Sequence, residues 1–330
     1  MEAPETAAIS HLIQNAYSSF ALLAGMQLGV FTSLADGRLD SQHVAEKIRV
    51  SSERLSPVLY ALAATGLLRV EGSRFVNSDE AQRYLIETSP DYVGNLHHLL
   101  SDLWSATLRT ADSIRLDHPQ AEHSFAEMHP VQLHNFLRGL HDEALATGRN
   151  LAANFDFSSY TRLLDVGGGS GGLAVAAAEA CPDLSATVVD LPEVIPFTRR
   201  FIREAKANQR IRTLALDVTR EPVPGEFDVA VVKAFIQTLS PDQAAVAISH
   251  VGAALRPGGA VYILGNGILD DCRYSPPDAA IFNIVFLNIY RGGRAYTESE
   301  YRNWLLQAGL SDVRRVRQTN GSSIITALKT

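Results

Sequence analysis

The sequence predicts an α/β protein in which a doubly wound parallel sheet follows an N-terminal domain of helices and a winged helix. From residue 161 onward, short apolar stretches alternate with helical ones, as in parallel α/β sheets. Residues 162–173 read as a buried strand that ends in a five-glycine turn and a helix start. A length of 330 residues with 46% hydrophobic content allows two domains with full cores.

The N-terminal stretch, residues 8–33, repeats apolar side chains at the spacing of a helix. These side chains occupy much of the helix circumference, so one side of the helix needs a cover. A second copy of the chain would provide this cover, and burial within the same chain is the alternative.

The next segment, residues 39–78, has the outline of a winged helix, with helices at 41–48 and 52–65 and a hairpin around 71–73. A helix that reads DNA needs a basic, polar face. The second helix is mostly apolar, and residues 1–100 hold 7 basic and 11 acidic side chains, a net charge of −4. We therefore expect this part to serve dimerisation and to wall the active site, without binding nucleic acid.

The residues between 101 and 155 read as a helical linker that precedes the α/β domain of residues 156–330. Four of the chain's ten histidines fall between His118 and His134, but their spacing is irregular and matches no zinc motif. The two cysteines, Cys181 and Cys272, have no metal-like spacing either. We expect no metal.

The glycine turn after the first strand of this domain places no Cβ atoms between a ligand and the backbone. The following strand, residues 185–189, closes with Asp190, which lies 18 residues after Gly172 and can accept both hydroxyl groups of a ribose. The turn begins with Asp165 and lacks the G-x-G-x-x-G spacing of nicotinamide sites.

The run Asp165-Val-Gly-Gly-Gly-Ser-Gly-Gly, followed by Asp190-Leu-Pro-Glu-Val, resembles the S-adenosylmethionine site of class I methyltransferases. Over about residues 10–328 the chain resembles the plant-type and bacterial small-molecule O-methyltransferases, including the acetylserotonin and hydroxyneurosporene methyltransferases. The resemblance implies a Rossmann-like sheet, a homodimer joined through its N-terminal helices and a small-molecule acceptor. The cofactor-binding positions that it implies are Asp165, Gly167, Gly169, Asp190, Leu191, Asp217, Val218 and Lys233.

The general base of this family is a histidine four residues after the cofactor-contacting lysine. Here Gln237 follows Lys233 at that spacing, and Asn266 and Ala295 occupy the positions of the two acids that orient the histidine. A glutamine cannot accept a proton near pH 7, so general-base help worth about 10²–10⁴-fold is missing at this position.

Three explanations remain open for the missing base. In the first, the acceptor needs no deprotonation: it is a thioether sulfur such as that of methylthio-hydroxybutyrate, an already ionised acid or thiol, or an enolate carbon. Proximity and desolvation then suffice, with Gln237 as a positioning group. Alternatively, a hydroxyl acceptor loses its proton to another residue, for which the candidates are His134, His141, His250 and Tyr290. Or the fold binds the cofactor for a non-methylating reaction. The joint loss of histidine and acids favours the first.

The acceptor pocket is expected from the helical linker and from residues 282–291. Phe136 and Leu140 match the family's pocket helix, with Leu140 where methionine is usual. Arg291 would bind an acceptor carboxylate, or else is a solvated loop charge. The predicted pocket residues are Trp104, Phe136, Leu140, Phe282, Asn283, Phe286 and Arg291.

The chain's net charge of −7 gives it no attraction for phosphate backbones. Its start lacks a basic region leading into an apolar stretch, and no segment runs 18 apolar residues. We expect a cytoplasmic protein that does not bind membranes.

Overall fold

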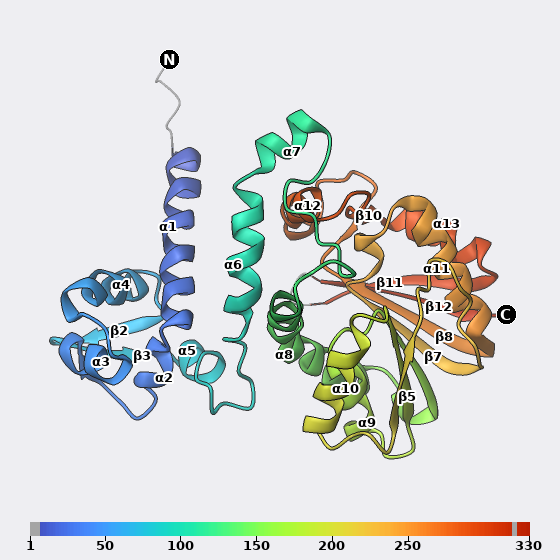
Figure 1. Cartoon of the computed structure of the whole chain (residues 1–330), viewed down its shortest axis with the longest axis horizontal. Helices are drawn as coiled ribbons and strands as arrows, with labels where there is room; N and C mark the ends of the chain where they lie inside the picture. The colour runs from blue at the N-terminus through green and yellow to red at the C-terminus, as the bar shows by residue number, and fades with distance from the viewer. Residues whose placement is uncertain (1–6, 319–321) are drawn as a thin grey trace. The chain divides into compact units, whose positions relative to one another are not determined.

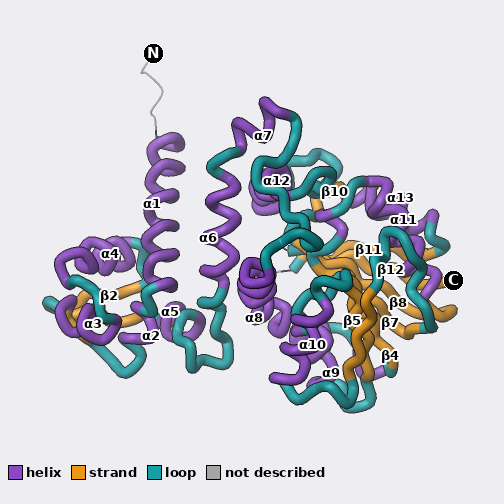
Figure 2. Tube along the Cα trace, viewed as in Figure 1, coloured by secondary structure: helices purple, strands orange, loops and turns teal. Residues whose placement is uncertain are grey.

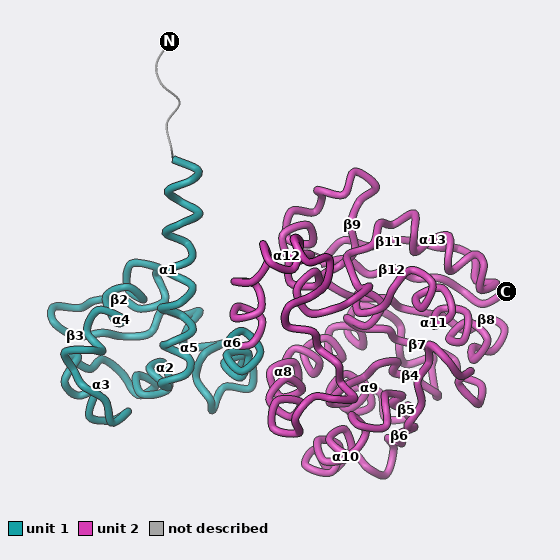
Figure 3. Tube along the Cα trace, turned by 45° about the horizontal axis from the view of Figure 1, so that its top comes forward, with its two compact units in different colours: residues 1–101 teal, residues 102–330 magenta. Residues whose placement is uncertain are grey.

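The computed structural model describes residues 7–318 and 322–330, which form two compact units. Residues 1–101 make up the first unit and residues 102–330 the second, as the two colours of Figure 3 show.

The first unit is the predicted winged helix with a long helix before it. Asp40 and Ser51 cap the two short helices by accepting hydrogen bonds from His43 N and Arg54 N. The strands pair antiparallel in the order β1-β3-β2. The elements are α1 (Ala7–Gln27), α2 (Val30–Ser33), β1 (Leu39–Asp40), α3 (Ser41–Ile48), α4 (Ser52–Ala64), β2 (Leu68–Glu71), β3 (Arg74–Asn77) and α5 (Asp79–Tyr84). Helix α6 (Leu96–Thr107) contains the boundary between the units.

The single helix expected over residues 8–33 is two helices. Gly29 has φ +71°, which ends α1 and turns the chain into α2. The C-terminal part of α1 is buried at Gly25 and Met26, whereas its N-terminal part leaves an apolar face in solvent. The members of this α1 face are Ile9, Leu12, Ile13, Tyr17 and Phe20, with 47–70% of each residue exposed.

The second unit is built on a seven-stranded sheet in the order β11-β12-β8-β7-β4-β5-β6. The five strands from β6 to β8 in this order are parallel, and β12 and β11 add antiparallel to β8 and to each other. The strands are β4 (Arg162–Val166), β5 (Ser185–Asp190), β6 (Ile211–Ala215), β7 (Phe227–Lys233), β8 (Leu255–Gly265), β11 (Leu310–Arg317) and β12 (Ser323–Lys329).

Helices cover both faces of this sheet, which explains why its central strands are almost wholly apolar. Helices α8, α9 and α10 pack on one face and α11 and α13 on the other (Figures 1 and 2). Their bounds are α8 (Pro130–Asn154), α9 (Gly172–Ala180), α10 (Ile195–Glu204), α11 (Pro241–Ala254) and α13 (Glu298–Gln307). The remaining elements are α7 (Thr110–Leu116), the 3₁₀ turns at Phe157–Ser159 and Ile236–Thr238, α12 (Pro277–Ile289), and the parallel pair β9 (Ile268–Leu269) and β10 (Tyr296–Thr297).

The alternating sheet is the predicted doubly wound fold, with two differences. The turn at 256–259, expected before the strand, lies within β8, which pairs with β7 from Leu255 onward across a register shift. Strands β11 and β12 were not predicted. The charged residues Arg314, Arg315 and Arg317 hide the strand pattern of β11, and charges of this kind protect an edge strand from further pairing.

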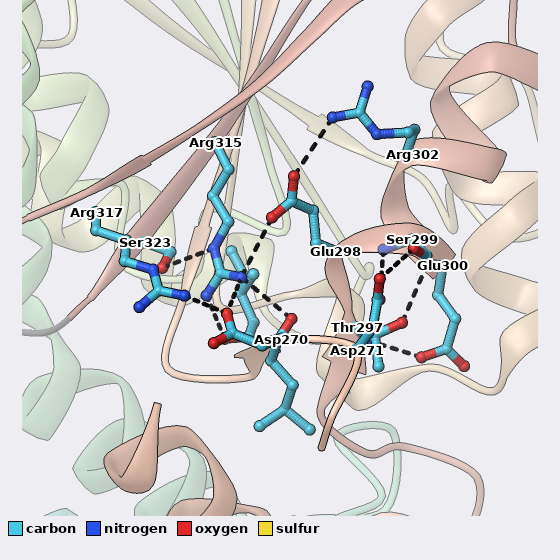
Figure 4. Close-up of polar contacts among 12 residues, drawn as sticks. Asp270, Asp271, Thr297, Glu298, Ser299, Glu300, Arg302, Arg315, Arg317 and Ser323 are labelled. Carbon is cyan, nitrogen blue, oxygen red and sulfur yellow. Dashed lines mark hydrogen bonds and ion pairs between the residues drawn. The ribbon is translucent and has the colours of Figure 1, made fainter. Parts of the chain in front are cut away.

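A buried arginine holds the segment that carries α12 against the sheet. Arg315 is only 4% exposed at its side chain and lies 2.7 Å from Asp270 Oδ1 and 3.4 Å from Glu298 Oε2 (Figure 4). It also donates to the carbonyl oxygens of Ile268 and Leu269. Since Asp270 and Glu298 lie on either side of α12 in the chain, one side chain fixes both ends of that segment.

Replacing Arg315 with methionine is expected to lower the free energy of unfolding by about 1–3 kcal/mol, because the partly exposed carboxylates of Asp270 and Glu298 and two backbone carbonyls lose the buried guanidinium that donates to them. Urea unfolding measures this loss. Arg302→Met is the matched control, since Arg302 pairs with the same Glu298 from a side chain that is 43% exposed. The control should cost less than about 1 kcal/mol. Equal losses in both variants would contradict an anchoring role for Arg315.

Candidate active site

The glycine turn lies at the carboxyl end of β4, in the middle of the sheet. Strand order reverses between β4 and β7, the place where open α/β sheets bind ligands. Gly167 and Gly169 have φ +62° and +54°. A Cβ on Gly167 would lie 2.7 Å from the Phe235 ring, and one on Gly169 would lie 3.3 Å from Leu137. The turn therefore needs glycine for both its conformation and its close neighbours.

Asp190, at the end of β5, faces this turn. Its Oδ2 accepts a hydrogen bond of 2.8 Å from Gly169 N, and its Oδ1 one of 2.8 Å from Leu191 N. Burial raises the pKa of Asp190 to about 6 against the lowering effect of these two hydrogen bonds. Each oxygen keeps a free lone pair, so the carboxylate fits a pair of ribose hydroxyls.

Asp165 lies fully buried behind the turn. Its Oδ2 has no hydrogen-bond partner among the described residues. Burial, and then the neighbouring carboxylate of Asp190, raise the pKa of Asp165 to about 7, while Lys233 lowers it. A buried and a half-buried carboxylate with raised pKa values fit a ligand that brings positive charge, as S-adenosylmethionine does with its sulfonium and ammonium groups.

The other predicted cofactor residues end the neighbouring strands. Lys233 closes β7, with Nζ 3.3 Å from Glu143 Oε1 on α8. After β6, Asp217 accepts hydrogen bonds from Thr219, and the carbonyl of Val218 contacts the His250 ring at 2.8 Å. The structure thus brings all the predicted cofactor residues to one edge of the sheet.

The affinity for S-adenosylmethionine is expected to rise between about pH 5 and 7. Because the pKa values of Asp190 and Asp165 are raised to about 6 and 7, the ligand-free site holds protons there that a cationic ligand displaces. The same protons make the ligand-free protein less stable as pH rises from about 4 to 7, since the unfolded carboxyls ionise earlier.

Calorimetry at pH 6 in two buffers of different ionisation enthalpy measures the released protons. Asp165→Asn should reduce the release, and Asp183→Asn, outside the site, should leave it unchanged. Affinity that stays constant from pH 5 to 7, without proton release, would contradict these raised pKa values.

Gln237 lies just after β7, where the chain turns sharply. Ala234 has φ +52°, a strained conformation for alanine, and leads into the 3₁₀ turn that holds Gln237. Gln237 is 4% exposed, and its side-chain amide makes no hydrogen bond within the described parts of the chain. It packs against Gly267, beside which Ala295 and Phe286 also lie.

A row of aromatic rings continues from Phe286 along the predicted acceptor pocket. Neighbouring ring centroids lie 6.1 Å apart for Phe286 and Tyr290, 6.3 Å for Tyr290 and His123, and 5.5 Å for His123 and Phe136. Phe282 packs on Phe286 at 5.2 Å. One aromatic row therefore contains residues from α12, from the loop after it, from the segment before α8 and from α8 itself.

The remaining predicted residues surround this row or lie outside it. Leu140 follows Phe136 by one helical turn, and Trp104 is half-buried on α6. Asn283 accepts a hydrogen bond from Ala295 N, so it supports the backbone there. Arg291 points outward, with a side chain that is 76% exposed and paired with Glu122.

Two of the histidines proposed as bases lie elsewhere, against α10. His134 and His141 both stack on Phe201, and His141 Nδ1 contacts Ser170 Oγ at 2.9 Å. Burial lowers the pKa of His141. The structure thus places both on the glycine-turn side of α8, while Tyr290 belongs to the aromatic row and Gln237 lies near its Phe286 end.

The fold and the site are those of a class I methyltransferase: a glycine turn follows the central strand β4, a carboxylate ends β5 and a lysine ends β7. In the described parts of the chain, no group of three or more His, Cys, Asp or Glu residues could hold a metal ion. None of the helices there is long and apolar enough to cross a membrane.

Comparison with known proteins gives the family. Residues 120–311 match the O-methyltransferase domain and residues 10–87 the O-methyltransferase dimerisation domain. The chain is 31% identical to the 3-hydroxy-5-methyl-1-naphthoate 3-O-methyltransferase of Streptomyces sahachiroi, over 94% of this chain and 90% of that protein. It is 30% identical to the acetylserotonin O-methyltransferase of Mus musculus, over 95% and 86%.

Among solved structures, human N-acetylserotonin methyltransferase in complex with SAM superimposes with a TM-score of 0.86 at 24% identity, over 100% of this chain and 99% of that one. The chain belongs to the O-methyltransferase family and is an S-adenosylmethionine-dependent methyltransferase.

Proposed function

We propose that this enzyme methylates a hydroxyl group on a small aromatic acceptor. The observation that carries the proposal is the aromatic row between Gln237 and Phe136, which offers ring faces and edges to a flat acceptor. The name of the Streptomyces sahachiroi relative, a naphthoate 3-O-methyltransferase, supports the same acceptor chemistry.

The residues of the site then have two roles: some hold the cofactor and others orient the methyl acceptor. Asp190 and the glycine turn hold the cofactor, which supplies a methyl group on a sulfonium sulfur. Gln237 contributes a buried side-chain amide, which can both donate and accept hydrogen bonds. This amide orients the methyl acceptor beside the cofactor site. The aromatic side chains exclude water, which favours transfer to a positioned nucleophile.

A thioether or carbon acceptor is the second candidate, because the position of the family's histidine holds Gln237. Such an acceptor has no proton to lose. Methyl transfer by proximity and desolvation alone would then be enough.

We also propose that two copies of the chain join through the α1 face. Its five apolar side chains, Ile9, Leu12, Ile13, Tyr17 and Phe20, are exposed in a single chain, and the surrounding segment matches the family's dimerisation domain. Leu12→Glu with Tyr17→Glu should convert a dimer to a monomer in sedimentation velocity. A wild-type monomer would refute this interface.

The acceptor is tested with methyl-labelled S-adenosylmethionine and mass spectrometry. Three probes at equal concentration cover the alternatives: 2-naphthol, 4-(methylthio)butanoate and phenylpyruvate. Label on the naphthol oxygen is the expected result. Label only on sulfur or on carbon would establish the second candidate instead and reject the first.

A further inference from the structure

One buried histidine of the aromatic row is positioned by a carboxylate that no motif identifies. The segment before α8 lies along the end of α12, where His123 N donates to Ile289 O at 2.8 Å and Ala121 N to Asn288 O at 3.3 Å. The ion pair between Glu122 and Arg291, at 2.8 Å, joins the same two segments. These three contacts fix His123 beside Tyr290.

Within the described residues, the polar contact of the His123 ring is made by Nε2, which lies 2.8 Å from Asp102 Oδ2 on α6. The His123 side chain is 6% exposed and that of Asp102 is 52% exposed. A carboxylate accepts here, so Nε2 carries the hydrogen, and in the neutral imidazole Nδ1 keeps its lone pair.

The second ring nitrogen is left without a partner. His123 Nδ1 is buried and has no hydrogen-bond partner among the described residues. Such orphaned polar atoms are rare in folded proteins, because burying one without a partner costs about 1–3 kcal/mol. The rings of Phe136 and Tyr290 pack edge-on against His123 and offer this nitrogen no polar replacement for water.

His123 is the side chain of the aromatic row that can accept a proton, because its neighbours are protonated, paired with an arginine or unable to titrate. Burial, and then the charge of Asp102, raise the pKa of Tyr290 far above its ordinary value, so its phenol stays protonated. Glu122 is paired with Arg291. Gln237, at the other end of the row, cannot take a proton.

We propose that His123 removes the proton from the acceptor hydroxyl, with Asp102 as its positioning residue. This inference rests on the proposed hydroxyl acceptor. The O–H bond of the acceptor breaks, and the proton bonds to Nδ1 of His123. The oxygen keeps the electron pair and forms a bond to the methyl carbon, whose bond to the sulfonium sulfur breaks with its electrons passing to sulfur. Asp102 balances the resulting imidazolium charge.

The covered position of Nδ1 gives the acceptor a specific route of binding. Nδ1 is buried, and the rings of Phe136 and Tyr290 pack on His123, so a flat acceptor has to displace neighbouring side chains to reach this nitrogen. Once inserted, its hydroxyl satisfies the orphaned nitrogen while its ring replaces the lost ring contacts.

The test compares two acceptors that differ in acidity. 2-Naphthol is protonated at pH 7, whereas 4-nitro-1-naphthol is ionised. His123→Phe keeps the ring packing but removes both nitrogens, and His123→Gln keeps a donor for Asp102. His43→Gln is the matched control, because His43 forms an exposed pair with Asp40 at the same distance of 2.8 Å, in the first unit.

Both His123 variants should methylate 2-naphthol about 100-fold more slowly than wild type in single turnover. With 4-nitro-1-naphthol they should be within a few-fold of wild type, because that acceptor needs no base. Asp102→Asn should lower the apparent pKa of the pH–rate profile. A loss that is equal for both acceptors, or no loss at all, would overturn the proposal. Circular dichroism and binding of S-adenosylmethionine check that each variant is folded.

A nitrogen NMR measurement separates failure of this inference from failure of the proposed function. In the presence of S-adenosylhomocysteine, 2-naphthol should shift the Nδ1 resonance of His123 toward a hydrogen-bonded value, and naphthalene should not. If wild type methylates neither naphthol but this shift occurs, only the proposed function fails. Without the shift, the assignment of His123 to the acceptor hydroxyl is wrong.

Discussion

Gly167→Val is expected to weaken S-adenosylmethionine binding by about 100-fold or more. Valine at φ +62° is strained by about 1–3 kcal/mol, and its Cβ would lie 2.7 Å from the Phe235 ring. Phe235 packs against the hydrophobic core, which limits how far its ring can move. The glycine turn must therefore distort, and Gly169, which donates to Asp190, moves with it. Isothermal calorimetry measures the affinity.

Gly258→Val separates the cofactor effect from general strain. Gly258 has φ +77° and no atom within 4 Å of its added Cβ, so valine there brings the backbone strain without the collision. The control should lose stability by a similar amount but keep its affinity for S-adenosylmethionine. If both variants bind equally well, the turn is not part of the cofactor site.

Asp190→Ala is expected to reduce S-adenosylmethionine affinity by about 10²–10⁴-fold. Two ribose hydroxyls bonded to one carboxylate contribute about 1.5–3 kcal/mol each, and 1.4 kcal/mol is a factor of ten. The variant also leaves Gly169 N and Leu191 N without their acceptor. Asp190→Asn keeps an acceptor oxygen and should lose less.

Ribose recognition by Asp190 has a ligand-side control. 5′-Methylthioadenosine and its 2′,3′-dideoxy analogue differ only in the hydroxyls that Asp190 is assigned to bind. Wild type should prefer the first strongly, and Asp190→Ala should bind both alike. Unchanged affinity in Asp190→Ala would show that the ribose lies elsewhere.

The α/β domain could be predicted because its signals are local. The strand at Arg162–Val166, the five glycines after it and Asp190 at the end of the next strand follow one another within 30 residues, and parallel topology brings the strand ends together. Helix α13 also begins at a local signal, the capping box that Thr297 forms with Glu300.

The end of α1 and the last two strands could not be predicted from such patterns. Apolar spacing continues across Gly29, and only the left-handed conformation of that residue shows where the helix stops. The sequence of β11 lacks the apolar pattern of a strand because it contains several arginines. One of them, Arg315, makes a tertiary contact with Asp270.

His123 could not be predicted as a site residue from the sequence, for a related reason. Its partner Asp102 is on α6, and its aromatic neighbours Phe136 and Tyr290 are on α8 and after α12, so no short motif contains the set. Composition offered only a cluster of four irregularly spaced histidines. The orphaned Nδ1 is a property of packing, which only coordinates reveal.

The most direct test is a crystal structure of the enzyme with S-adenosylhomocysteine and 2-naphthol. The cofactor product should lie on the Gly167–Gly169 turn with its ribose on Asp190. The naphthol should lie among the rings of Phe136, Tyr290 and Phe286, with its oxygen within hydrogen-bonding distance of His123 Nδ1. A naphthol bound away from this row, or with His123 still covered, would contradict both the acceptor pocket and its base.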